Sequence, residues 1–236
     1  MEFFDLLIGE LSDLLNTEKM KFYLYSSENL WEEEDISHVI LGRDMLAELD
    51  GTGFNLVTSK KVSDGVFVIG DELQNIKGKR KFARVCVVQT EDNSDEQKSY
   101  NLIRKIDYVK YHFFPKGFMI RTSSRAHKEG VRVSKAAVKN GISFRLIGSL
   151  LIKKYKENPA VKGVTVYYIT DEKADFGRLE SMAEKSNKIT ETLNHVMNSI
   201  KFDCDTCNLK PICDEVEGMK ELHFKNKEAV CCDEKK

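Results

Sequence analysis

The chain has 236 residues, of which 41% are hydrophobic, so it is long enough to bury a core without disulfide cross-links. Its 37 basic and 38 acidic residues give a net charge of −1, which argues against nucleic acid and anionic membranes as partners. No apolar run approaches the roughly 20 residues that span a bilayer, and the first residues lack the basic region of a signal peptide, so we expect a cytoplasmic protein.

The N-terminal part of the chain predicts one helix followed by strands. Apolar residues recur at helical spacing across residues 2–16, and we expect this amphipathic helix to pack on the core. A short strand is predicted over 21–25, and residues 54–90 contain short apolar or alternating runs separated by turn signals. Cys86 lies within one of these runs, which favours a small core side chain over a metal ligand.

Helices and strands alternate in the second half of the chain. The hydrophobic spacing predicts helices over 96–112, 135–139, 143–158 and from 171 or 175 to about 198, with strands over 118–122 and 164–170. We therefore expect a mixed α/β fold in which helices cover a mixed sheet. The expected domains are an N-terminal helix and strand (1–35), an α/β domain (36–200) and a Cys-rich metal-binding tail (201–236).

A basic segment over residues 121–135 precedes one of the predicted short helices. Positive side chains close to a helix N-terminus can hold a phosphate or a carboxylate. Arg125, Arg132 and Lys135 are the candidate anion-binding residues in this segment. The alternative interpretation is an ordinary solvated loop.

Five of the six cysteines fall in the last 33 residues of the chain. Cys204 and Cys207 have the C-x2-C spacing that lets two thiolates reach one metal from a single turn, and Cys213 follows after five residues. In a reducing compartment such a cluster indicates metal binding or catalysis rather than cross-linking. A second group, Cys231-Cys232, lies closer to the end of the sequence.

The spacing favours an iron–sulfur cluster over zinc. Three closely spaced cysteines with a distant fourth are a common arrangement for a [4Fe–4S] cluster. A structural zinc ion is more often held by two C-x2-C or C-x2-H pairs. Zinc, or thiols without a metal, remain the alternatives. The fourth ligand is open between Cys231, Cys232 and His223, with Cys231 taken as the candidate.

Four stretches of the sequence, taken in order, resemble the middle domain of the CO dehydrogenase/acetyl-CoA synthase beta subunit. The most specific is Arg132-Val-Ser-Lys-Ala-Ala-Val-Lys-Asn-Gly141. The others are Leu56-Val-Thr, Val62-Ser-Asp-Gly-Val-Phe-Val-Ile-Gly-Asp71 and Tyr168-Ile-Thr-Asp-Glu-Lys173. The cysteine stretch falls where that family places the first cysteines of its nickel–iron–sulfur cluster, and Cys204, Cys207 and Cys213 match the first three.

The resemblance implies a specific chemistry. Enzymes of that family condense CO, a corrinoid-bound methyl group and coenzyme A into acetyl-CoA. Four cysteines hold a [4Fe–4S] cluster that bridges to one nickel, and a Cys-Gly-Cys motif holds a second nickel. The partners that the resemblance implies are CO dehydrogenase, a corrinoid protein and coenzyme A, in an anaerobic cell.

The departures from the family pattern decide the expected function. The sequence contains no Cys-Gly-Cys and no counterpart of the catalytic C-terminal domain, and Gly130 stands where the family commonly has a tryptophan. We therefore expect an iron–sulfur protein that transfers electrons or docks with a partner. The alternatives are a truncated acyltransferase with a reduced nickel–iron–sulfur site, and a zinc- or thiol-stabilised module that binds an anion or coenzyme A. Whether the chain is an enzyme stays open.

Overall fold

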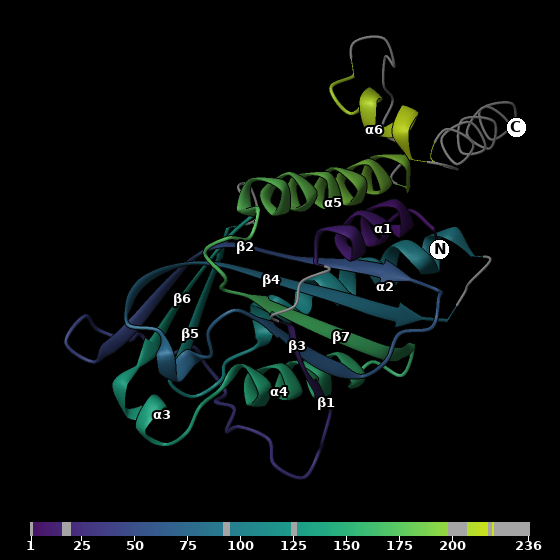
Figure 1. The fold of residues 1–236 in the computed structure, drawn as a ribbon. Helices are drawn as coiled ribbons and strands as arrows, with labels where there is room; N and C mark the ends of the chain where they lie inside the picture. The colour runs from purple at the N-terminus through teal and green to yellow at the C-terminus, as the bar shows by residue number, and fades with distance from the viewer. Residues whose placement is uncertain are drawn as a thin grey trace, which may run out of the picture.

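One mixed seven-stranded sheet organises the chain in the computed structural model, which describes residues 2–15, 20–91, 95–123, 127–197, 207–216 and 219 (Figure 1). The strand order is β1-β3-β7-β4-β2-β6-β5, with parallel pairing in β3–β7 and β2–β4 and antiparallel pairing elsewhere. The strands are β1 (Met20–Leu24), β2 (Met45–Thr58), β3 (Gly65–Ile69), β4 (Gly78–Thr90), β5 (Phe118–Ser123), β6 (Lys128–Ser134) and β7 (Val161–Ile169).

Helices pack on both faces of the sheet. On one face α4 contacts β3 and β7; on the other α5 contacts β2 and β4, with α1 packed on β2 and α2 on α5 (Figure 1). The helices are α1 (Asp5–Leu14), α2 (Glu96–Tyr108), α3 (Lys135–Lys139), α4 (Phe144–Lys156), α5 (Phe176–Met197) and α6 (Lys210–Glu215), with short 3-10 turns η1 (Leu73–Asn75) and η2 (Val109–His112). This three-layer arrangement confirms the predicted α/β fold class.

Aromatic side chains pack together where α4 meets the middle of the sheet. The Phe144 ring of α4 stacks on Tyr168 of β7 at 4.6 Å between centroids, and both stack on Phe82 of β4 at 6.1 Å. Gly148 allows the close approach of helix and sheet, because a Cβ there would meet Val66 Cγ2 at 2.5 Å. Aromatic stacking therefore holds α4 against β4 and β7.

The helix starts follow the capping residues. Ser134 begins α3, its hydroxyl accepting from the Ala137 N–H at 2.9 Å, and Ser143 begins α4 in the same way. These side chains satisfy backbone donors that lack an intrahelical partner. Within the described part of the chain, no helix has the length and apolar character needed to cross a membrane.

Two strands start earlier than the sequence pattern predicts. β2 begins at Met45 and β4 at Gly78, whereas the apolar runs start at about 54 and 82. The early part of β4 carries Lys79, Arg80 and Lys81, and it still forms a parallel ladder with β2. Hydrogen bonding to β2 extends β4 beyond its buried residues, which is why hydrophobicity did not mark its start. The early part of β2 does contain buried residues, Ala47 and Leu49, but they alternate with Glu48 and Asp50.

Candidate functional site

Two thiols of the cysteine cluster lie at α6. The Cys207 carbonyl accepts a hydrogen bond from the Lys210 N–H at 3.1 Å, closing the turn that enters the helix. Cys213 lies inside the helix, and its N–H donates to the Leu209 carbonyl at 3.2 Å. Both thiol side chains are half-buried. The structure therefore places Cys207 in the turn before α6 and Cys213 within the helix.

The other predicted ligands lie outside the described residues. These are Cys204, Cys231, Cys232 and His223. Among the residues that the structure does describe, no three His, Cys, Asp or Glu side chains converge in a way that could hold a metal ion. The metal site of the tail thus stays a prediction from the sequence.

The turn that carries the thiols is anchored on α5. Ile212, Val216 and Met219 are buried, and all three belong to the main hydrophobic core. Lys185 of α5 reaches Glu215 of α6, with 2.8 Å between Nζ and Oε1. The hydrogen bond with Glu215 is the main cause of a raised pKa for Lys185. Any group held by this turn would consequently sit at a fixed place on the domain.

Two of the three predicted anion-binding residues hydrogen-bond to other groups of the protein. Arg132 lies in β6, where its Nε donates to Glu48 Oε1 at 3.2 Å. Lys135 begins α3, and its Nζ donates to the Arg43 carbonyl at 2.7 Å. Arg125 lies outside the described residues. The segment that was expected to be a basic loop is largely the antiparallel hairpin β5–β6.

A cavity of about 460 Å³ opens between the N-terminal end of α5, the starts of β4 and β6, and the middle of β2. Lys81 reaches over the Phe176 ring, with 5.8 Å from Nζ to the centroid, and Lys79 Nζ lies 3.6 Å from Glu48 Oε2. The lining residues are Asp50, Gly51, Thr52, Lys79, Arg80, Lys81, Phe82, Lys128, Phe176, Gly177 and Glu180. Basic side chains outnumber acidic ones on its walls, so the cavity favours an anion.

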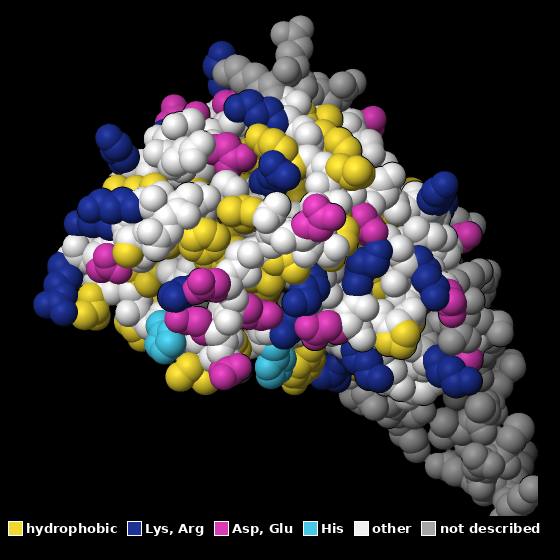
Figure 2. All heavy atoms as spheres, turned by 90° about the horizontal axis from the view of Figure 1, so that it is seen from below, with side chains coloured by type: hydrophobic (Ala, Val, Ile, Leu, Met, Phe, Trp, Pro, Cys, Tyr) yellow, Lys and Arg dark blue, Asp and Glu magenta, His cyan; other side chains and the backbone are white. Residues whose placement is uncertain are grey.

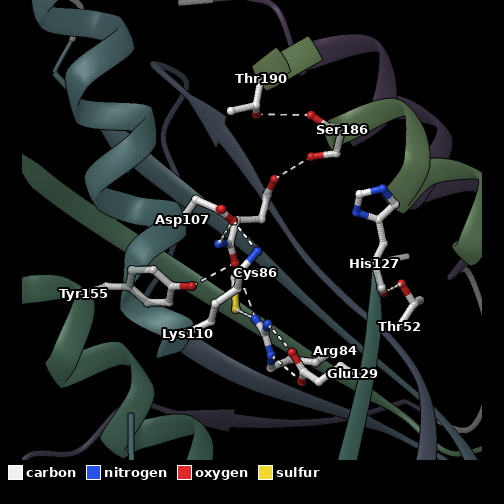
Figure 3. A network of polar contacts seen from close by, with 11 residues as sticks. Thr52, Arg84, Cys86, Asp107, Lys110, His127, Glu129, Tyr155, Ser186 and Thr190 are labelled. Carbon is white, nitrogen blue, oxygen red and sulfur yellow. Dashed lines mark hydrogen bonds and ion pairs between the residues drawn. The ribbon is translucent and has the colours of Figure 1, made fainter. Parts of the chain in front are cut away.

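A buried polar network crosses the sheet below α5 (Figure 3). Arg84 of β4 binds Glu129 of β6 through two hydrogen bonds, 2.8 Å from Nε and 2.6 Å from an Nη nitrogen. Arg84 is only 2% exposed and Glu129 only 1%. A further Nη nitrogen lies 3.0 Å from the Cys86 sulfur. All three nitrogens of the guanidinium therefore donate to buried groups of the protein.

Asn55 of β2 connects this ion pair to three helices. Its side-chain oxygen accepts from the Tyr155 hydroxyl of α4 at 2.8 Å, and its amide donates to Asp107 of α2 at 3.4 Å. Its backbone carbonyl accepts from the Ser186 hydroxyl of α5 at 3.0 Å. Figure 3 shows these side chains reaching the sheet from both layers of helices. Asn55 thus joins the three layers of the fold.

Burial shifts the pKa values of the titratable groups in this network. Burial raises the pKa of the Cys86 thiol, although the Arg84 guanidinium opposes the shift. Burial alone would lower the pKa of Arg84, but the Glu129 carboxylate, together with Cys86 and Tyr155, acts in the opposite direction and the pKa is raised. Arg84 is therefore always charged, and Cys86 stays a protonated thiol. This agrees with the prediction that Cys86 is a core side chain.

The buried polar network was not predicted from the sequence, although two features of the sequence point to it. Arg84 interrupts the otherwise apolar run Ala83-Arg-Val-Cys86. Gly53 has no side chain on the neighbouring strand, and a Cβ there would meet Glu129 Oε2 at 2.0 Å. An arginine within a buried strand requires a carboxylate partner, and a glycine beside it provides the space.

The sequence matches a known protein family over most of the sheet-forming region. The model of the CO dehydrogenase/acetyl-CoA synthase complex beta subunit matches residues 32–174, which is more than half of the chain. The chain belongs to this beta-subunit family. A comparison with curated proteins finds no match.

The match to the beta-subunit family covers the sheet rather than the cysteine turn. Residues 32–174 include six of the seven strands, from β2 to β7, together with α2, α3 and α4. The ion pair of Arg84 and Glu129 lies inside this range, whereas Cys207 and Cys213 lie beyond it. Membership of the beta-subunit family is therefore carried by the α/β domain.

Proposed function

We propose that this protein is an iron–sulfur member of the beta-subunit family that transfers electrons to, or docks with, a component of a CO dehydrogenase complex. The ligands would be Cys204, Cys207, Cys213 and Cys231. The observation that carries the proposal is that Cys207 precedes α6 and Cys213 lies within it, on a short helix that is anchored on α5 through buried side chains. Family membership supports the choice of partner.

The donor set fits the proposed group. Thiolates are the ligands of [4Fe–4S] clusters, and the two described thiols are half-buried, which allows access during assembly and partial exclusion of water afterwards. When bound, such a cluster accepts and releases one electron at a time. The chain's own residues would fix its position, because Ile212 and Met219 are buried and Lys185 pairs with Glu215.

The test is metal analysis on full-length protein purified without oxygen. We expect about four irons and an equal amount of sulfide per chain, with a broad visible absorption that dithionite bleaches. Cys207→Ser and Cys213→Ser should each lose most of the iron. Cys86→Ala is the matched control, because Cys86 is buried in β4 and should leave the iron content unchanged. Zinc at about one per chain, or wild-type protein that takes up no iron, would overturn the proposal.

A second candidate function is anion binding, with coenzyme A as the ligand that the family suggests. The specific observation is the cavity beside α5, which Lys81 and Lys128 both line. Among the described residues, neither lysine forms an ion pair with a carboxylate. Unpaired ammonium groups around a concave site attract phosphate.

Titration calorimetry with coenzyme A tests this candidate. The double variant Lys81→Ala/Lys128→Ala should weaken binding by roughly tenfold or more, since each lost contact to a phosphate is a charge-assisted hydrogen bond. Lys139→Ala, an exposed lysine of α3, is the control and should bind as wild type does. Pantetheine, which lacks the phosphates, should not bind. Equal affinity in the double variant would contradict the assignment.

A further inference from the structure

Strand β1 forms one edge of the described sheet, and three of its four exposed side chains are apolar. Among the described strands, β1 pairs only with β3 (Figure 1). Met20, Phe22 and Leu24 alternate along it and are 40%, 47% and 71% exposed. Because side chains alternate between faces in a strand, all three lie on the same face. An edge strand with this pattern can pair with another chain.

The central side chain of this edge is held in place. The Phe22 ring lies 4.6 Å from Phe67 of β3, and Phe67 stacks on Tyr167 of β7 at 4.9 Å. Phe22 also covers Gly65, where a Cβ would meet the ring at 2.2 Å. The aromatic row that crosses three strands thus ends at an ordered, half-exposed ring on the edge.

The opposite edge of the sheet, β5, differs from β1 because a neighbouring segment covers part of it and its outer half is polar. The Ile40 N–H donates to the Met119 sulfur of β5, so the segment before β2 packs along that strand. The outer half of β5 is Arg121-Thr-Ser123, which is polar. Polar residues and a covering segment are the usual protections of an edge strand. Among the described strands, β1 is the edge that offers apolar side chains.

We propose that β1 pairs with β1 of a second copy of this chain, antiparallel, about a two-fold axis at Phe22. In this register Phe22 faces its own copy, Met20 faces Leu24, and Lys21 faces Tyr23. Apolar side chains meet apolar ones, and no two like charges are opposed, so the five-residue strand is complementary to itself. The aromatic row would continue from one copy into the other.

The dimer should be weak and depend on concentration. Five-residue strands bury a small area, and interfaces below about 1,200 Å² are those of transient complexes. A net charge of −1 for each chain adds little repulsion. We therefore expect a monomer–dimer equilibrium with a dissociation constant roughly in the micromolar range.

Sedimentation velocity of the full-length protein, with reductant present, tests the proposal. Wild-type protein should shift from the monomer to the dimer as its concentration rises. Phe22→Lys and Phe22→Glu should each remain monomeric, because like charges would meet at the two-fold axis. An equimolar mixture of the two variants should form a heterodimer. Leu6→Lys, at a 62% exposed position on α1, is the control and should dimerise as wild type does.

A second variant guards against loss of fold. Leu24→Lys changes the most exposed of the three apolar positions of β1, which has the least packing to lose, and should weaken the dimer while circular dichroism stays unchanged. Wild type that stays monomeric at several hundred micromolar would overturn the proposal, as would a Phe22→Lys variant that still dimerises. The same holds if the two charged variants fail to pair when mixed.

Discussion

Arg84 and Glu129 are two charges inside the sheet, and their burial carries a large desolvation cost. The two short hydrogen bonds between them offset that cost only while both partners are present. Removal of one partner leaves a buried charge without compensation. The ion pair therefore makes the correct alignment of β4 with β6 across β2 a condition for stability.

Replacement of Glu129 tests this condition. Glu129→Ala should lower the free energy of unfolding by about 3–5 kcal/mol, measured in urea. The apolar pair Arg84→Met/Glu129→Leu should recover most of the loss, because no unpaired charge remains. Arg132→Ala removes a partly exposed ion pair with Glu48 and should cost less than about 1 kcal/mol. A loss below about 1 kcal/mol for Glu129→Ala would contradict the argument.

His127 gives a prediction for pH. Burial lowers its pKa below the ordinary value, and Lys110 adds to the shift, whereas Glu184 and Glu191 oppose it. Its neutral form is therefore favoured in the folded state. The unfolded chain binds the proton more readily, so this contribution is present above about pH 6.5 and is lost as the pH falls towards the folded pKa.

The measurement is the thermal unfolding midpoint at pH 7.5 and 5.5. His127→Asn is the suitable variant, because His127 has a φ of 49° and asparagine tolerates this left-handed conformation. The midpoint should drop more on acidification in wild type than in the variant. An identical drop in both proteins would show that His127 does not contribute.

Among the helices, two glycines predict opposite effects of the same substitution. Gly9 lies in α1, and no heavy atom lies within 4 Å of the place that an added methyl group would take, so Gly9→Ala should stabilise the protein by about 0.5–1 kcal/mol. Gly148 lies where α4 touches the sheet, and the new methyl group would press on Val66. Gly148→Ala should therefore destabilise by about 1–3 kcal/mol in urea unfolding. Equal signs for the two variants would contradict the close packing of α4.

The difference between local sequence patterns and contacts with distant parts of the chain explains how much of the fold could be predicted. The helix over 135–139 and the strand near 164–170 follow from capping and apolar patterns within the sequence, and both are present as α3 and β7. The basic residues 128–134 form a strand only because they pair with β2 and β5. Likewise, the partner of Arg84 lies 45 residues away, at Glu129, and only the strand order brings the two together. Local sequence patterns therefore predict individual helices and strands, whereas the pairing of strands decides which distant side chains meet.

At the scale of the whole molecule, chain order and spatial order differ strongly. β7, the last of the described strands, lies between β3 and β4, so the sheet is completed only when the C-terminal half has folded. Ile212 of α6 and Met219, which lies beyond that helix, then join the same core. The face below the sheet, on the side of α4, carries intermixed acidic and basic side chains, as the near-zero net charge requires (Figures 1 and 2).

This architecture predicts a gradient of hydrogen exchange. Interior amides of β4 and β7 should exchange most slowly in dilute protein, because both strands are paired on two sides and covered by helices. Amides of β1 should exchange faster, since this strand has one neighbour and exposed side chains. Exchange followed by mass spectrometry at low and high protein concentration separates two causes of protection. If copies pair through β1, its exchange alone should slow as the concentration rises; protection of β1 equal to that of β4 in dilute protein would contradict the edge position.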